Sequence, residues 1–150
     1  MMDKNDAVEP ISAELDSLTV ALIDYALDEL ASEGRLSVSL VLGDEEGNAT
    51  LLSFDDDDFD ESIDEAHATV QRSAGQVVEG LTSACVRYAI AYDGAIDEDG
   101  SGYEPALIVE YGERGMSRGY SAYLTYENPG EPQDFVCSQA APAGVVELLV

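Results

Sequence analysis

The sequence predicts an α+β domain in which two helices pack on an antiparallel sheet of about five or six strands. Apolar residues recur at helical spacing in two segments and alternate at strand spacing through most of the rest of the chain. The connections between the predicted strands are short enough for hairpins, which join antiparallel strands. The expected order is α-β-β-α-β-β-β, extended in one version by a terminal strand, with the helices covering a face of the sheet.

The first helix is predicted over residues 10–32. Pro10 suits the first turn, where a helix has no partner for a backbone N–H. Gly34 suits the left-handed residue that follows a helix. Residues 1–9 are polar and expected to be flexible, so a single domain is predicted over 10–150. The helical stripe consists of Ile11, Leu15, Leu18, Leu22 and Ala26.

A hairpin and a second helix follow. Apolar residues alternate with polar ones over 36–42 and again over 50–54, with turn-forming residues between them. Four aspartates at 55–58 interrupt this pattern. Helical spacing then returns over 60–74, where carboxylates in the first turn complement the positive end of the helix dipole.

The carboxyl-terminal half is predicted to form strands. A loop is expected over 93–102, and the glycines at 112, 115 and 119 are expected in a later connection. The tail 145–150 is apolar enough to dock as a last strand or turn. The strands are expected at 84–92, 106–111, 120–126 and 135–137.

The composition excludes several classes of partner. The 150 residues include 32 Asp and Glu but only 6 Lys and Arg, a formal net charge of −26. Nucleic acids and anionic membranes both require a basic surface, so neither is an expected partner. The first residues lack a signal-peptide pattern, which predicts a cytoplasmic protein. The acidity fits adaptation to salt, a surface that promotes solubility, or an acidic binding face.

A glycine-rich turn carries the candidate anion site. Arg114 and Arg118 are two of only five arginines, and guanidinium groups with free backbone N–H groups hold carboxylates or phosphates. The alternative is that these arginines pair with acids of the same chain. The further candidate ligand-binding residues near this turn are Glu110, Glu113, Tyr111 and Asp93.

A second candidate is a calcium loop. Asp97, Asp99 and Ser101 match the first ligands of such a loop, and a glycine follows at the sixth position. The twelfth position is Ile108, where a bidentate glutamate is required. The pattern is therefore incomplete, and a solvated hairpin tip explains it better.

One histidine and two cysteines complete the candidates. Thiol catalysis requires a cysteine within hydrogen-bond reach of His67, and the spacing of Cys85 and Cys137 does not establish this. No zinc-ligand spacing occurs, and no cofactor is predicted. Buried structural cysteines are the commoner outcome in a reducing compartment.

Part of the carboxyl-terminal half resembles a known group of proteins. Residues 88–94 and 106–115, together with the strand that contains Tyr120, are similar to small bacterial proteins of unknown function. The resemblance implies a bacterial α+β domain and no activity.

Three functions remain as hypotheses. The leading one is a non-catalytic binding or interaction protein that binds a protein partner or a second copy of itself, because a sheet offers strand edges for pairing. The first alternative is a small-molecule or anion-binding protein, or an enzyme, centred on Arg114 and Arg118. The second alternative is an acidic nucleic-acid mimic that occupies the basic cleft of another protein.

Overall fold

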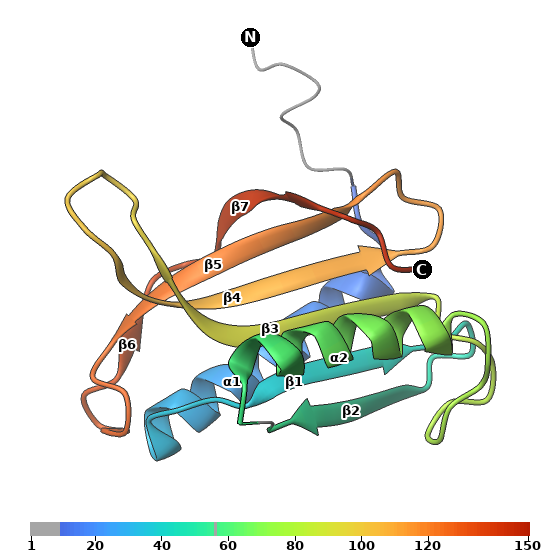
Figure 1. The fold of residues 1–150 in the computed structure, drawn as a ribbon, viewed down its shortest axis with the longest axis horizontal. Helices are drawn as coiled ribbons and strands as arrows, with labels where there is room; N and C mark the ends of the chain where they lie inside the picture. Colours follow the sequence, from blue (N-terminus) through green and yellow to red (C-terminus); the bar gives the residue numbers. More distant parts are fainter. Residues whose placement is uncertain (1–9, 56) are drawn as a thin grey trace, which may run out of the picture.

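The computed structural model describes residues 10–55 and 57–150, which form an α+β fold (Figure 1). The seven strands within these residues build one antiparallel sheet in the order β2-β1-β3-β4-β5-β6, and β7 pairs with β5. The predicted fold class is confirmed. The elements are α1 (Ala13–Glu33), β1 (Val38–Gly43), β2 (Ala49–Phe54), α2 (Phe59–Ser73), β3 (Arg87–Ile96), β4 (Glu104–Glu113), β5 (Gly119–Glu127), β6 (Val136–Cys137) and β7 (Ala141–Val146).

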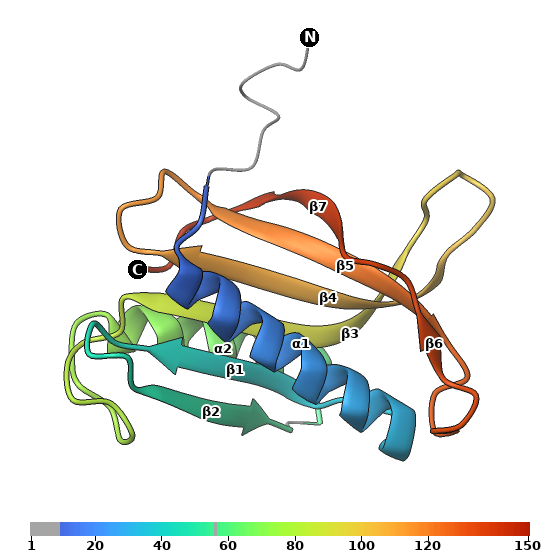
Figure 2. The ribbon, with the colours of Figure 1, turned by 180° about the vertical axis from the view of Figure 1, so that it is seen from behind.

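The two helices cover opposite faces of the sheet, which differs from the expectation that they cover a face together. Figure 1 shows α2 in front of the sheet and Figure 2, from behind, shows α1. The sheet therefore has two cores. Leu22 of α1 packs with Ala89 and Val109 on one face, whereas Val70 of α2 packs with Leu40 on the other. Alternate side chains of a strand point to opposite faces, so both faces of the central strands are apolar.

Local signals set the ends of α1. The hydroxyl of Ser12 caps the helix by accepting a hydrogen bond from the N–H of Leu15 at 3.0 Å. The helix thus begins at Ala13, and Pro10 precedes it rather than lying in its first turn. Gly34 adopts a φ of 77° and donates its N–H to the carbonyl of Leu30 at 3.1 Å. This left-handed residue ends the helix as predicted.

Some residues predicted to lie in loops belong to strands. Asp93 and Gly94 are part of β3, because β3 continues to pair with β4 as far as Ile96. Gly112 and Gly119 lie in β4 and β5 rather than in the connection between them. A Cβ atom on Gly112 would lie only 2.9 Å from the hydroxyl oxygen of Tyr88, so glycine permits close packing there.

The carboxyl-terminal segment is docked on the sheet, in agreement with the prediction. Residues up to Val146 form β7, and Leu148, Leu149 and Val150 then pack against the core under α2. The N–H of Leu149 donates to the hydroxyl of Tyr88 at 3.4 Å. The tail therefore contributes to the core on the α2 face.

The carboxylate of Asp44 closes the β1–β2 hairpin and joins it to the segment before β3. Its side chain is fully buried. Burial by itself would raise the pKa of this carboxyl, but the hydrogen bonds that it accepts outweigh burial and hold the pKa well below its usual value. Its oxygens accept from the backbone N–H groups of Thr82 at 2.8 Å, Asn48 at 2.9 Å, Glu46 at 3.1 Å and Ser83 at 3.3 Å.

We predict that Asp44→Asn lowers the unfolding temperature at pH 7 by several degrees, because an amide NH₂ would face backbone donors. A carboxyl whose pKa is depressed on folding stabilises the protein above its unfolded pKa of about 3.8 and loses this contribution as the pH falls below it. The difference between the variant and the native protein therefore shrinks at pH 3. Thermal denaturation at both pH values measures it.

The matched control is Asp99→Asn, which changes a carboxylate that also caps its own turn, but in an exposed loop. We expect a much smaller change for this variant. Equal effects of the two substitutions would show that Asp44 does not hold the hairpin junction.

Candidate functional site

The two arginines of the predicted anion site lie in the turn between β4 and β5. The Nη2 atom of Arg114 is 3.4 Å from the carbonyl oxygens of Ala74 and Cys85, and its backbone N–H donates to Val86 at 2.7 Å. Arg114 therefore connects the turn to the end of α2. Arg118 is exposed, and it forms no ion pair within residues 10–55 and 57–150.

The other residues predicted for this site are divided between the two faces of the sheet. Glu110 points toward α2, whereas Tyr111 and Glu113 lie on the α1 side. Glu110, Tyr111, Glu113 and Asp93 each contact a residue outside the turn that carries the arginines, so the structure does not bring them together around Arg114 and Arg118. The partners are His67 and Tyr92 for Glu110, Arg87 and Ser12 for Glu113, Tyr126 for Asp93, and Tyr120 for Tyr111.

The loop predicted as a calcium site is an exposed hairpin tip whose carboxylates serve the loop itself. Asp97 accepts a hydrogen bond from the N–H of Gly100 at 2.7 Å, and Asp99 accepts one from the N–H of Ser101 at 3.0 Å. No cluster of three or more His, Cys, Asp or Glu side chains placed to hold a metal occurs in the described part of the chain. The turn hydrogen bonds are sufficient to explain these residues.

The cysteines do not pair with the histidine. The thiol of Cys85 is buried, its pKa is raised by that burial, and it donates to the carbonyl of Arg87 at 3.1 Å. Cys137 is exposed on β6, and both thiols are free. The hydrogen-bond partner of His67 is Glu110.

A polar network lies between α2 and the sheet, and sequence analysis did not predict it. Glu110, only 7 % exposed, accepts hydrogen bonds from Nε2 of His67 at 3.0 Å and from the hydroxyl of Tyr92 at 2.6 Å. The bond to Glu110 raises the pKa of His67 despite partial burial, with further support from the charges of Asp64 and Glu147. Burial opposes ionisation of Glu110, but the two donors outweigh it and lower the pKa of that carboxyl.

This network predicts a pH dependence of stability. A histidine whose pKa rises on folding stabilises the protein below its unfolded pKa of about 6.5, and the contribution is lost as the pH rises through the folded pKa. We predict that the unfolding temperature falls as the pH rises above 6.5, and that His67→Gln abolishes this decline. Because the chain has one histidine, a single imidazole NMR titration measures the pKa directly.

The NMR titration also gives the contradicting outcome for the network. An imidazole pKa at or below 6.5 would show that the ion pair with Glu110 is absent in solution. The conservative variant Glu110→Gln lowers the pKa of His67, since it removes the charge and leaves an acceptor in place.

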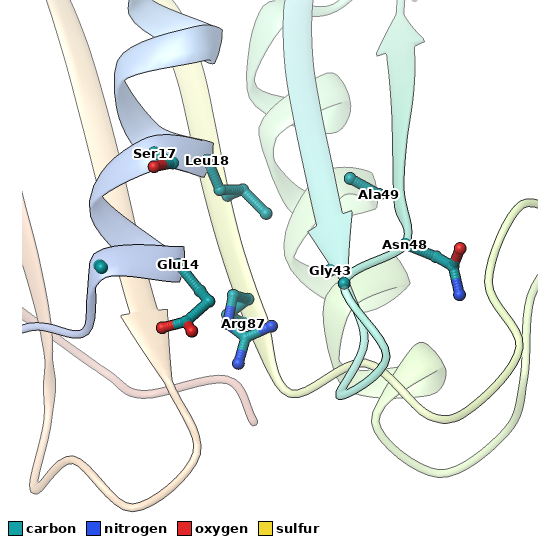
Figure 3. A pocket seen from close by; sticks show the side chains of 9 residues that line it. Glu14, Ser17, Leu18, Gly43, Asn48, Ala49 and Arg87 are labelled. Atoms are coloured by element: carbon teal, nitrogen blue, oxygen red, sulfur yellow. The ribbon is translucent and has the colours of Figure 1, made fainter.

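A groove lies between α1 and the β1–β2 hairpin, and we name it the α1–β2 groove. At one end is a cavity of about 420 Å³ lined by Glu14, Ser17 and Leu18 of α1 and by Gly43 and Ala49, and Figure 3 shows the side chain of Leu18 pointing toward the hairpin. A Cβ atom at Gly43 would lie 2.8 Å from Cδ1 of Leu18, so glycine lets the helix approach closely at this point.

A second, more apolar cavity of about 260 Å³ lies further along α1 and shares Ala49 with the first. The side chains that line this second cavity come from α1, β1 and β2, and Leu51 of β2 is 44 % exposed. The groove exists because α1 lies mainly over β3 and its neighbours, so that β2 has no helix on this face. The lining residues are Ala21, Leu22, Tyr25, Val41, Ala49, Thr50 and Leu51.

Two features of the sequence are consistent with this groove. Ala13, Ser17 and Ala21 place small side chains at intervals of four on one side of α1, which leaves space beside the helix. Leu51 is an apolar residue at a position that alternation assigns to the face opposite Leu52. Neither signal identifies a groove until the strand order is known.

Comparisons with known proteins give this chain no relative. No protein-family model matches it, no curated protein matches its sequence, and no solved structure matches its fold. Neither described helix combines the length and apolarity needed to span a membrane. Function therefore has to be inferred from the surface of the chain itself.

Proposed function

We propose that this protein is a non-catalytic binding module that holds a basic, partly apolar segment of a partner protein in the α1–β2 groove. The observation that carries the proposal is the coincidence of an apolar groove, an exposed strand beside it, and lining elements α1, β1 and β2 that contain no lysine or arginine. Apolar concave surfaces with a charged rim are typical of binding sites.

The charge distribution supports a basic partner. The elements α1, β1 and β2 contain no lysine or arginine, and Arg87, which lines one end of the groove, is paired with Glu113 at 2.7 Å. Complementary charge accelerates association and excludes acidic competitors. Exposed carboxylates occur on α1, in the hairpin and after β2: Glu14, Asp16, Asp24, Asp28, Glu45, Glu46, Asp55, Asp57 and Asp58.

The proposal differs from the nucleic-acid mimic in what holds the partner. A mimic presents charge along an extended surface, whereas Leu51 and Tyr25 offer apolar area in the groove. Burying such area contributes to affinity at any salt concentration, while the charges contribute mainly at low salt. A cytoplasmic, bacterial protein is part of the proposal, supported by the free thiols and by the resemblance of β3–β5.

The test uses a designed probe, the peptide KTVTLTVTK, and its counterpart with glutamate in place of lysine. We predict that the basic peptide shifts the amide NMR signals of Ala21, Val41 and Leu51, and that the acidic peptide does not. Leu51→Glu weakens binding about tenfold or more, because it removes apolar contact.

The matched control is Val145→Glu, since Val145 is an aliphatic residue of similar exposure on β7, away from the groove. We expect this variant to bind the basic peptide as the native protein does. Binding of neither peptide, or shifts that avoid α1, β1 and β2, would contradict the proposed function.

A further inference from the structure

We infer that the basic segment binds as an added β-strand along the free edge of β2, an inference that rests on the proposed function and specifies its mode. Strand addition supplies affinity through backbone hydrogen bonds and specificity through alternate side chains. The geometry of the β1–β2 hairpin determines which atoms of β2 are available.

The turn of the β1–β2 hairpin shows which residue pairs of β1 and β2 are hydrogen-bonded. The N–H of Asp44 donates to the carbonyl of Asn48 at 3.0 Å, which makes these two residues a hydrogen-bonded pair. Antiparallel pairs alternate between hydrogen-bonded and non-hydrogen-bonded, so Thr50 and Leu52 bond to β1. The N–H and C=O groups of the alternate residues, Ala49, Leu51 and Ser53, consequently point away from the sheet.

The sequence and pairing of β2 itself show none of the devices that natural strands use to block pairing, although Gly80 packs against Thr50 near the start of the strand. β2 contains no proline, no lysine and no irregularity in its pairing with β1 over its six residues. The opposite edge has them: β6 is two residues long, and β7 includes Pro142, Gly144 and a register shift against β5. The contrast between the two edges indicates that the edge of β2 is the one available for pairing with an added strand.

The side chains of β2 define what an added strand must carry. Ala49, Leu51 and Ser53 are exposed on the α1 face, so residues opposite them also point to that face. The residue opposite Leu51 therefore extends the apolar surface of the groove. Exposed carboxylates lie at both ends of β2, Glu45 and Glu46 before it and Asp55 after it, which favours Lys or Arg at the ends of the segment.

A second copy of this chain fits the same edge poorly. Antiparallel pairing of two β2 strands around Leu51 would bring the acids after one strand beside those in the hairpin of the other. Like charges placed opposite each other destabilise a sheet, and no lysine or arginine of α1, β1 or β2 is present to offset them. The preferred occupant is a basic segment of another protein.

Backbone methylation of the probe peptide tests the mode of binding. With the central leucine of KTVTLTVTK opposite Leu51, the N–H groups of peptide residues 3, 5 and 7 face β2, and those of residues 4 and 6 face away. We expect N-methylation at residues 3 and 5 to weaken binding about tenfold or more, and the isomer methylated at residues 4 and 6 to bind like the parent.

The outcomes separate this inference from the proposed function. If both methylated isomers bind as the parent does, if both lose binding equally, or if their order is reversed, strand addition in this register is wrong while groove binding stands. If the parent itself does not bind, the proposed function fails. A dimer that forms through β2 in light scattering at millimolar salt would also overturn the choice of occupant.

A protein variant gives an independent readout. Ser53→Pro removes an outward N–H without removing a bond to β1, because Ser53 and Ser39 form a non-hydrogen-bonded pair. We expect Ser53→Pro to weaken binding of the unmethylated peptide about tenfold, whereas Ser53→Ala leaves binding unchanged. Equal affinity of the two variants would overturn the inference, and the methylated peptides retain the test should Ser53→Pro fail to fold.

Discussion

The packing of α1 against the small residues of β3 determines the shape of this protein. Ala89 and Ala91 present little side-chain bulk, so the apolar stripe of α1 docks over them and over neighbouring Val109. Leu22 and Ala26 are buried in this contact. Because the helix is centred here, the α1 face of β2 remains without cover. The other face of β2 is covered by α2, which explains why its side chains alternate between half-buried and exposed.

A chain of polar contacts holds α1 and the hairpin at a defined separation. Ser12, which caps α1, donates to the carboxylate of Glu113 at 2.9 Å, and the same oxygen accepts from Nε of Arg87 at 2.7 Å. Arg87 also donates from Nη1 to the carbonyl of Asp44 at 2.7 Å. Charge-assisted bonds of this kind link the start of the helix, β4, β3 and the turn. The width of the α1–β2 groove is therefore fixed at one end by contacts among buried and half-buried groups.

In the proposed complex, the acidic surface and the α1–β2 groove would make different contributions to binding. Most of the carboxylates are dispersed and exposed, and they are screened beyond about 8 Å at physiological salt. Only carboxylates close to the proposed bound segment would contribute specificity, and these include Glu14 in the groove and Asp55 after β2. In the proposed complex, the edge of β2 would supply the directional contact, and like charges on two copies would oppose pairing of their β2 strands.

Sequence periodicity predicted most of the fold, because helices and strands leave different apolar spacings. It placed α1 and α2 to within three residues at each end. The candidate anion site was grouped by proximity along the chain, and alternation within a strand explains why the structure places its members on both faces of the sheet. Glu110 and Glu113 are an odd number of residues apart on β4, so they face opposite sides of the sheet.

The groove was beyond sequence analysis for a different reason. It depends on β1 pairing with β3, whose residues Val41 and Ala89 are distant in the chain, and this pairing places β2 at the edge. Short-range patterns carry no information about such pairings. The network of His67 and Glu110 was missed for the same reason, since its members come from α2 and β4.

Amide hydrogen exchange of the free and peptide-bound protein is the most direct test of binding at the edge of β2. In the free protein, the amides of Leu51 and Ser53 face solvent and exchange rapidly, while those of Thr50 and Leu52 are held by β1. Binding of KTVTLTVTK is predicted to slow exchange at Leu51 and Ser53 and to change Thr50 and Leu52 little. Unchanged exchange at Leu51 and Ser53 with the peptide at saturation would contradict the account.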